Sequence, residues 1–382
     1  MRDYIKVLDI IRKKIDKRME INSPKSGMYE SAFSDESGNY IKDYINFFEG
    51  WGWTKSFLTV AVAYMYYHYK DEKYLRYLEK ELPVYEEYQY FRRSGYFHDM
   101  GFLFTLYSSA LYEVSGNKEA YRISIKAADD VGKGYMPAVG MLDGFSGAAH
   151  DTTNPIIDDM MNMLILVWAW KKTKHPYYYR IFTSHIKKVK QYMLRDDFTF
   201  RHSFLFESAT GAPLGERNYC GFAPGSVWAR GQMWAFYGLI SALKATGNVG
   251  LYGDTINGQL TRLISLLDDE VVPLWDFNCV SEKADMRDSS AGIIMAAALL
   301  KLNDVEDNMD SDSTLKLSGK AQHYNEIAEK MLDKLLDDYM YDEGCTAIIK
   351  SAQVGYENRG SVWGDYFLVE ALMKKNTRQR MP

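Results

Sequence analysis

Cysteine is scarce in this chain: its 382 residues include three, Cys220, Cys279 and Cys345, which lie far apart in the sequence. This spacing excludes a CxxC metal site and a dense disulfide framework, and it is typical of a reducing compartment. No apolar run of about 18 residues occurs, so we expect no membrane span. Residues 1–22 have the pattern of an amphipathic helix and not of a signal peptide, so we expect a cytoplasmic protein.

Charge of one sign is not in large excess either. The chain has 46 basic and 51 acidic residues, a formal net charge of −5. Nucleic-acid-binding proteins usually carry a basic face, so we expect no nucleic-acid partner. The sequence lacks the GxSxG, HExxH, Walker and GxGxxG motifs, and no two histidines stand four residues apart. We therefore expect neither a metal nor a cofactor.

The chain does contain a repeating pattern, in which strongly apolar segments alternate with more charged, amphipathic segments. Turn signals such as Gly116-Asn117 and Gly247-Asn248 separate them, because glycine ends a helix and asparagine caps the next one. The pattern predicts buried helices at about 54–70, 99–115, 156–172, 228–246, 288–301 and 361–375. It predicts outer helices at about 73–91, 118–131, 177–193, 252–268 and 320–338. Short strands are candidates near 199–206 and 345–350.

Six buried helices that alternate with about six outer helices predict an all-α (α/α)6 toroid, in which the buried helices surround an axis. An open helical solenoid is the alternative. No linker rich in proline, glycine or serine divides the chain. We therefore expect a single domain over residues 1–382, with an N-terminal helix at 1–22 and a polar insert at about 303–318.

Each buried segment is preceded by polar and aromatic residues. These stretches are residues 51–57, 98–102, 156–162, 226–234, 287–292 and 361–367. In a toroid they would gather at one end of the axis, where helix N-termini carry partial positive charge and favour an anionic ligand. The tryptophans among them suit the C–H faces of a sugar ring. One end of the ring is therefore predicted to bind an acidic sugar.

Single residues in these stretches allow more than one interpretation. Asp99 and Asp158 stand where N-caps are expected, so each is either a capping residue or a carboxylate of the site. Arg230 lies inside an apolar run and needs a partner, which is either a structural carboxylate such as Asp99 or the carboxylate of a ligand. His98 and His202 are either site residues or hydrogen-bonded core histidines.

The same stretches resemble the unsaturated glucuronyl hydrolases of glycoside hydrolase family 88. The strongest matches are HDMGF at 98–102, IDDMMN at 157–162 and SVWARGQMW at 226–234. The stretches DSSAGII at 288–294 and WGDYFLVEA at 363–371 also fit, so that the resemblance runs from about Trp53 to Glu370. Members of that family have an (α/α)6 barrel, which agrees with the fold predicted from the repeat.

The resemblance implies an enzyme for oligosaccharides that polysaccharide lyases leave with a terminal 4,5-unsaturated uronic acid. Such an enzyme hydrates the C4=C5 double bond, after which the hemiketal opens and the neighbouring sugar is released. Glycosaminoglycan-type disaccharides are the favoured substrates. The alternatives are an unsaturated rhamnogalacturonyl hydrolase and a non-catalytic toroid that binds oligosaccharides.

The resemblance also implies roles for single residues. Asp158 would be the general acid that protonates C4 and then the base that activates water, with Asp99 as its essential partner. Substrate-binding positions would be His202, Arg230, Trp234, Trp53, His98, Gln232 and Cys220. At Cys220 the chain departs from the family, which usually has glutamine there. Because an acid needs a raised pKa near neutral pH, we expect Asp99 to face Asp158 and raise its pKa.

Overall fold

The computed structural model describes residues 2–22, 28–44, 52–91, 98–144, 151–306, 321–351 and 359–376. The polar insert predicted at about 303–318 therefore lies largely outside the described residues, and its first residues belong to a helix that continues to Glu306. No helix in the described part of the chain is long and apolar enough to cross a membrane.

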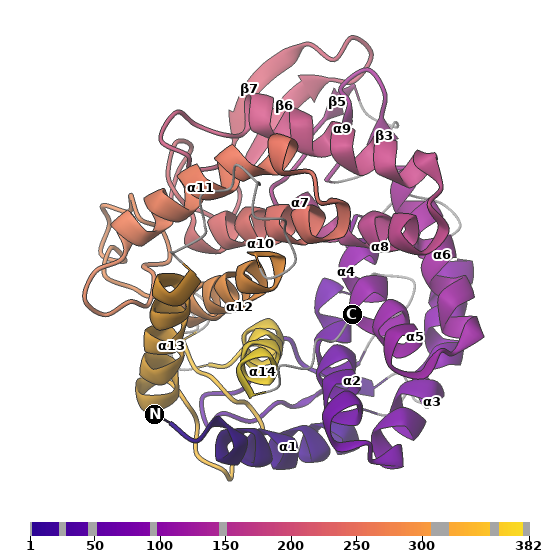
Figure 1. The fold of residues 1–382 in the computed structure, drawn as a ribbon, viewed down its shortest axis with the longest axis vertical. Helices are drawn as coiled ribbons and strands as arrows, with labels where there is room; N and C mark the ends of the chain where they lie inside the picture. The colour runs from indigo at the N-terminus through magenta and orange to yellow at the C-terminus, as the bar shows by residue number, and fades with distance from the viewer. Residues whose placement is uncertain are drawn as a thin grey trace.

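An inner layer of helices is built from the segments predicted to be buried (Figure 1). It consists of α2 (Phe57–Tyr69), α4 (Met100–Phe104) with the π-helical turn η3 (Thr105–Ser109) and α5 (Ala110–Ser115), α7 (Asp159–Asn162) with α8 (Leu164–Thr173), α10 (Ala229–Thr246), α12 (Ser289–Glu306) and α14 (Val362–Asn376). These helices are apolar nearly all round because both of their faces are covered by other helices.

An outer layer surrounds them at the periphery of the view in Figure 1. Its members are α1 (Tyr4–Ile21), α3 (Glu72–Phe91), α6 (Lys118–Gly132), α9 (Pro176–Tyr192), α11 (Val249–Leu266) and α13 (Ala321–Asp338). The predicted turns are confirmed at two junctions. Gly116 and Gly247 have positive φ angles of 72° and 67°, and Asn117 and Asn248 accept hydrogen bonds from the first turns of α6 and α11.

The ring is closed, because α14 packs against α2. The fold is therefore an (α/α)6 toroid and not an open solenoid. The N-terminal helix α1 packs on both α14 and α2 and so takes the sixth outer position. Its buried Arg18 lies 2.7 Å from Glu30 and 3.0 Å from Asp365 of α14. This buried ion-pair network connects the two ends of the chain.

Short strands fill the connections. β1 (Met28–Glu30) pairs with β2 (Lys42–Tyr44), β3 (Tyr135–Met136) pairs with β4 (Met141–Leu142), and β6 (Ser203–Glu207) lies between β5 (Thr152–Thr153) and β7 (Pro213–Arg217). The strand predicted near 199–206 is present as β6. The strand predicted near 345–350 is not formed. That segment instead makes an isolated bridge between Ile349 and Met340.

Candidate active site

A cavity of about 560 Å³ lies at the end of the ring where the inner helices begin. Asp99 and Asp158 both line it, so the ring brings the two predicted carboxylates into one site. The full lining comprises Ala32, Phe33, Trp53, Thr54, His98, Asp99, Ile156, Asp158, Tyr219, Cys220, Trp228, Arg230, Trp234, Trp275, Asp288 and Trp363. Within the described residues, no group of three or more His, Cys, Asp or Glu side chains is arranged to hold a metal ion.

His98 connects two aspartates. Its Nδ1 lies 3.1 Å from Oδ1 of Asp159, and its Nε2 lies 3.2 Å from Oδ1 of Asp99. Burial alone would lower the pKa of His98, but the two carboxylates raise it well above its ordinary value. The protonated ring therefore orients the carboxylate of Asp99 and offsets its charge.

Asp158 and Asp99 occupy the N-cap positions of α7 and α4, but neither side chain makes a capping hydrogen bond. The capping interpretation is therefore wrong for both. The Oδ2 atom of Asp158 is buried and has no hydrogen-bond partner among the described residues, while Nε2 of His202 lies 3.7 Å away. A carboxylate oxygen in this position can exchange a proton with a ligand in the cavity.

The pKa of Asp158 is lowered, contrary to the expectation that Asp99 would raise it. Burial acts to raise this pKa, but His202 and, after it, His98 and Arg230 lower it by a larger amount. The positive charges of the site outweigh the effect of a second carboxylate, and His98 offsets the charge of Asp99. Without a ligand, the site therefore keeps Asp158 ionised.

His202 is held by the loop that follows β7. Its Nδ1 accepts hydrogen bonds from the N–H groups of Tyr219 (2.9 Å) and Cys220 (3.2 Å), and Oδ1 of Asn218 lies 3.1 Å from the same nitrogen. These contacts direct Nε2 toward Asp158. The backbone of Cys220 thus positions His202, while the side chain of Cys220 lines the cavity.

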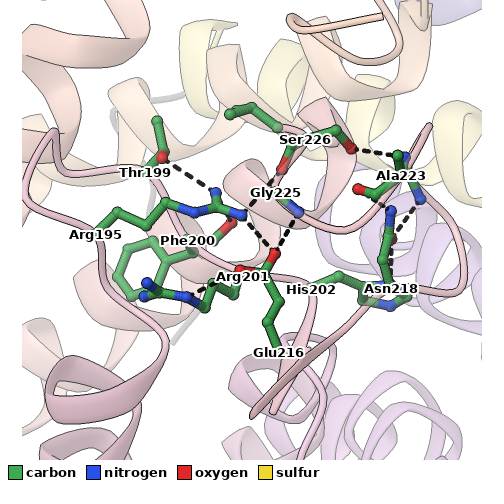
Figure 2. A network of polar contacts seen from close by, with 12 residues as sticks. Arg195, Thr199, Phe200, Arg201, His202, Glu216, Asn218, Ala223, Gly225 and Ser226 are labelled. Carbon is green, nitrogen blue, oxygen red and sulfur yellow. Dashed lines mark hydrogen bonds and ion pairs between the residues drawn. The ribbon is translucent and has the colours of Figure 1, made fainter.

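Figure 2 shows how the same loop is fixed from outside the cavity. Glu216 of β7 lies 2.7 Å from Arg195 and 3.0 Å from Arg201, and it accepts a hydrogen bond of 2.8 Å from the N–H of Gly225. Arg195 also donates to the carbonyl of Ser226. The far end of the loop is therefore tied to β7 through Glu216 and to the segment before β6 through Arg195.

Arg230 has a structural partner, but the partner is Asp288 and not Asp99. Its Nη1 lies 3.0 Å from Oδ2 of Asp288, and its guanidinium lies 5.2 Å and 5.1 Å from the ring centroids of Trp228 and Trp363. The rings and the carboxylate hold the guanidinium in the wall of the cavity, where it also faces any ligand.

Comparison with known proteins identifies the family. Residues 32–268 match the model of Glycosyl Hydrolase Family 88. The chain belongs to this family of hydrolases. It is 26% identical over 350 residues, 89% of each chain, to the unsaturated glucuronyl hydrolase of Bacillus sp. (strain GL1). It is 28% identical over 287 residues to the unsaturated chondroitin disaccharide hydrolase of Streptococcus pneumoniae (strain ATCC BAA-255 / R6), covering 72% of this chain and 70% of that one.

The fold agrees with solved structures of the family. The crystal structure of the Bacillus sp. GL1 unsaturated glucuronyl hydrolase superposes with a TM-score of 0.85 at 23% identity, covering 97% of this chain and 96% of that one. The structure of an unsaturated glucuronyl hydrolase from Streptococcus agalactiae gives the same TM-score and covers 100% of this chain and 94% of that one, also at 23% identity. These matches show that the fold is shared over the whole ring.

Two of the predicted aromatic residues form part of the wall in this family 88 chain. The ring of Trp53 lies 5.1 Å from Trp363 and 5.3 Å from Phe102, and Trp234 lies 5.6 Å from Phe102. Trp234 is almost fully buried, with 1% of its surface exposed, so it supports the base of the cavity more than it presents a free face.

Gln232 does not line the cavity. Its Oε1 accepts the N–H of Phe200 at 2.7 Å, and its Nε2 donates to the carbonyl of Phe200 at 2.9 Å. The prediction of direct substrate contact therefore does not fit the geometry of Gln232. Because Phe200 precedes His202 by two residues, Gln232 acts as a positioning residue for that histidine.

Several lining residues were not predicted individually. Asp288 and Trp363 lie within stretches that the sequence marks as helix entrances, and Asp288 precedes its helix as Asp99 and Asp158 precede theirs. Asp288 could therefore have been predicted as a lining residue from this shared position. Tyr219 and Trp275 lie in irregular loops, where no periodic pattern identifies the side chains that face a cavity.

Proposed function

We propose that this hydrolase releases a terminal 4,5-unsaturated uronic acid from oligosaccharides made by lyases, by hydrating the C4=C5 double bond. The observation that carries the proposal is Asp158, which lines the cavity and whose buried Oδ2 has no hydrogen-bond partner among the described residues. The names of the relatives support it, and so does the structure of a Streptococcus agalactiae enzyme mutant complexed with dGlcA-GalNAc6S, which superposes with a TM-score of 0.77 at 23% identity.

The charges of the cavity suit an acidic sugar. His98 and Arg230 supply positive charge within a partly enclosed space, where attraction to the uronate carboxylate is stronger than in bulk water. Indole rings contribute large apolar faces, whose negative charge density attracts the C–H groups of a pyranose ring. The cavity therefore offers both kinds of contact that an unsaturated uronic acid requires.

The reaction uses one carboxyl group twice. Asp158 in its acid form transfers a proton to C4, and positive charge develops at C5. The carboxylate that results then accepts a proton from water as the water oxygen bonds to C5. The hemiketal formed at C5 opens to a ketone, which converts C1 to a hemiacetal that expels the neighbouring sugar. Asp99, oriented by His98, keeps the charge around this exchange fixed.

Substrate binding prepares the acid form. In the free site, His202, His98 and Arg230 lower the pKa of Asp158. The carboxylate of a bound uronate adds a negative charge beside His98 and Arg230 and offsets their positive charge, and the bound sugar also excludes water. Both effects raise the pKa of Asp158, so that the group takes up its proton when substrate binds.

We further propose unsaturated glycosaminoglycan disaccharides as the substrate class, supported by relatives named as unsaturated chondroitin disaccharide hydrolases. We also propose that the enzyme works in the cytoplasm, which its three unpaired cysteines support.

The proposal is tested by incubating the protein with unsaturated chondroitin, hyaluronan, heparin and rhamnogalacturonan disaccharides and following the ultraviolet absorbance of the conjugated enol acid. We expect the absorbance to fall with a glycosaminoglycan disaccharide and to persist with Asp158→Asn, which still binds the sugar. Asp254, an exposed aspartate of α11, provides the matched control, and we expect Asp254→Asn to keep full activity. Unchanged turnover in Asp158→Asn would reject Asp158 as the acid, and no loss with any sugar would favour a binding toroid.

A further inference from the structure

A second cavity, of about 200 Å³, lies at the opposite end of the ring, where the inner helices end. Phe102 lines this cavity and packs 5.6 Å from Trp234, which lines the active-site cavity, so an aromatic wall separates the two. The charged residues that line the second cavity are Lys171, Lys244, Lys301, Lys374, Glu113 and Glu370. The lining therefore carries more positive than negative groups.

The carboxylates near this cavity are shared among the lysines. Glu370 lies 3.7 Å from Lys301 and 3.8 Å from Lys374, while Asp304 lies 3.2 Å from Lys244 and 3.5 Å from Lys374. Lys301 also donates hydrogen bonds to the hydroxyl groups of neighbouring side chains on α10. Two carboxylates thus serve three ammonium groups, which leaves positive charge without full compensation.

The fourth lysine of the lining, Lys171, forms no hydrogen bond or ion pair with any described residue. Glu113 attracts Lys171 and acts to raise its pKa, but this carboxylate is already ion-paired with Lys172 at 2.5 Å. Burial lowers the pKa of Lys171, Lys244 and Lys301, and repulsion from other lysines lowers each of them further. For Lys301 the pKa falls to about 7.

Two hydroxyl groups point to a ligand independently of the charges. Thr105 and Ser109 begin and end the π-helical turn η3, and both line the cavity. Neither hydroxyl oxygen has a hydrogen-bond partner among the described residues, although both atoms are buried and Ser109 is only 3% exposed. A serine within a helix ordinarily donates to a carbonyl of the preceding turn, and π-helical turns occur often at functional sites.

We propose that this cavity binds a small oxyanion of the phosphate or sulfate type. The ammonium groups of Lys301, Lys244 and Lys171 offset its charge, and the hydroxyl groups of Thr105 and Ser109 donate hydrogen bonds to its oxygens. Lysines near helix C-termini also complement the helix dipoles. The helix dipoles account for the lysines but not for the two unpaired hydroxyl groups, whereas a bound oxyanion accounts for both.

The test is isothermal titration of inorganic phosphate and of inorganic sulfate into the full chain at low ionic strength, with chloride as the reference anion. We expect saturable binding of one oxyanion per chain. Loss of one charge-assisted hydrogen bond weakens binding by about tenfold or more, so Lys301→Met and Ser109→Ala should each show such a loss. The matched control Lys187→Met removes an exposed lysine of the outer helix α9 and should bind like the wild type.

The variant Arg230→Ala identifies which cavity is occupied. We expect it to bind phosphate and sulfate as the wild type does. Oxyanion binding that is lost in Arg230→Ala but retained in Ser109→Ala would place the anion in the active-site cavity and overturn the proposal. So would the absence of saturable binding in the wild type. Ser109→Ala removes only a hydroxyl group, so we expect this variant to fold. It therefore still tests the proposal if Lys301→Met fails to fold.

Discussion

At the scale of single residues, each carboxylate of the active-site cavity lies beside a histidine or an arginine. Asp99 pairs with His98, Asp288 with Arg230, and Asp158 has His202 at 3.7 Å. The entrances of the buried helices marked Asp99 and Asp158 as candidates, and the resemblance to family 88 supplied their predicted roles. The pairing of Arg230 with Asp288 could not be found from the sequence, because Arg230 lies in α10 and Asp288 precedes α12, so that the two meet only when the ring forms.

Arg230 is predicted to bind the uronate carboxylate. The change Arg230→Ala should weaken binding of an unsaturated disaccharide by about 10- to 100-fold, because a hydrogen bond to a charged group contributes about 1.5–3 kcal/mol. Binding of the carboxyl-reduced analogue, measured by the same titration, should weaken much less. Equal losses for the two ligands would make Arg230 a structural residue that only supports the wall.

The pH profile of the reaction tests how substrate binding shifts the pKa of Asp158. The profile of kcat/KM reports the free enzyme, in which the pKa of Asp158 is lowered, and the profile of kcat reports the complex. Because the acid form is required and substrate raises its pKa, activity should fall as pH rises in both profiles. The fall in kcat should occur at higher pH than the fall in kcat/KM. Profiles that fall at the same pH would contradict substrate-driven proton uptake.

At the scale of elements, the helices were predictable, but of the short strands only β6 was. The inner helices are apolar on all sides and the outer ones on one side, and the Gly-Asn turns mark their junctions. Strands of two to five residues have no such pattern, because their partners are distant in sequence. For the same reason, the loop after β7 that holds His202 could not be recognised, although His202 itself could.

The N-terminal helix α1 should contribute strongly to stability through Arg18. The change Arg18→Met leaves Glu30 and Asp365 buried without their shared cation, which is expected to lower the free energy of unfolding by about 3–5 kcal/mol. Urea denaturation followed by circular dichroism measures this change. Lys13→Met is the matched control on the same helix, where an exposed ion pair contributes less than about 1 kcal/mol. An Arg18→Met protein as stable as this control would show that the network does not hold α1 to the ring.

At the scale of the whole molecule, alternating helices predict the ring, but its closure depends on one contact between distant parts of the chain. The pattern alone leaves a solenoid open as an alternative, and packing of α14 on α2 decides against it. The place of α1 as the sixth outer helix was also not predictable. Amphipathicity shows that one face of a helix is buried, but it does not show against which helices that face packs. Closure gives the ring two ends, and the described residues line a separate cavity at each.

The central claim is that the enzyme acts on the double bond and not on the glycosidic bond directly. The most direct test is to measure release of the neighbouring sugar from a chondroitin disaccharide with an unsaturated uronate, and from the same disaccharide with a saturated one. We expect release from the unsaturated sugar only, in step with the loss of ultraviolet absorbance. Release from the saturated disaccharide at a similar rate would contradict action on the double bond.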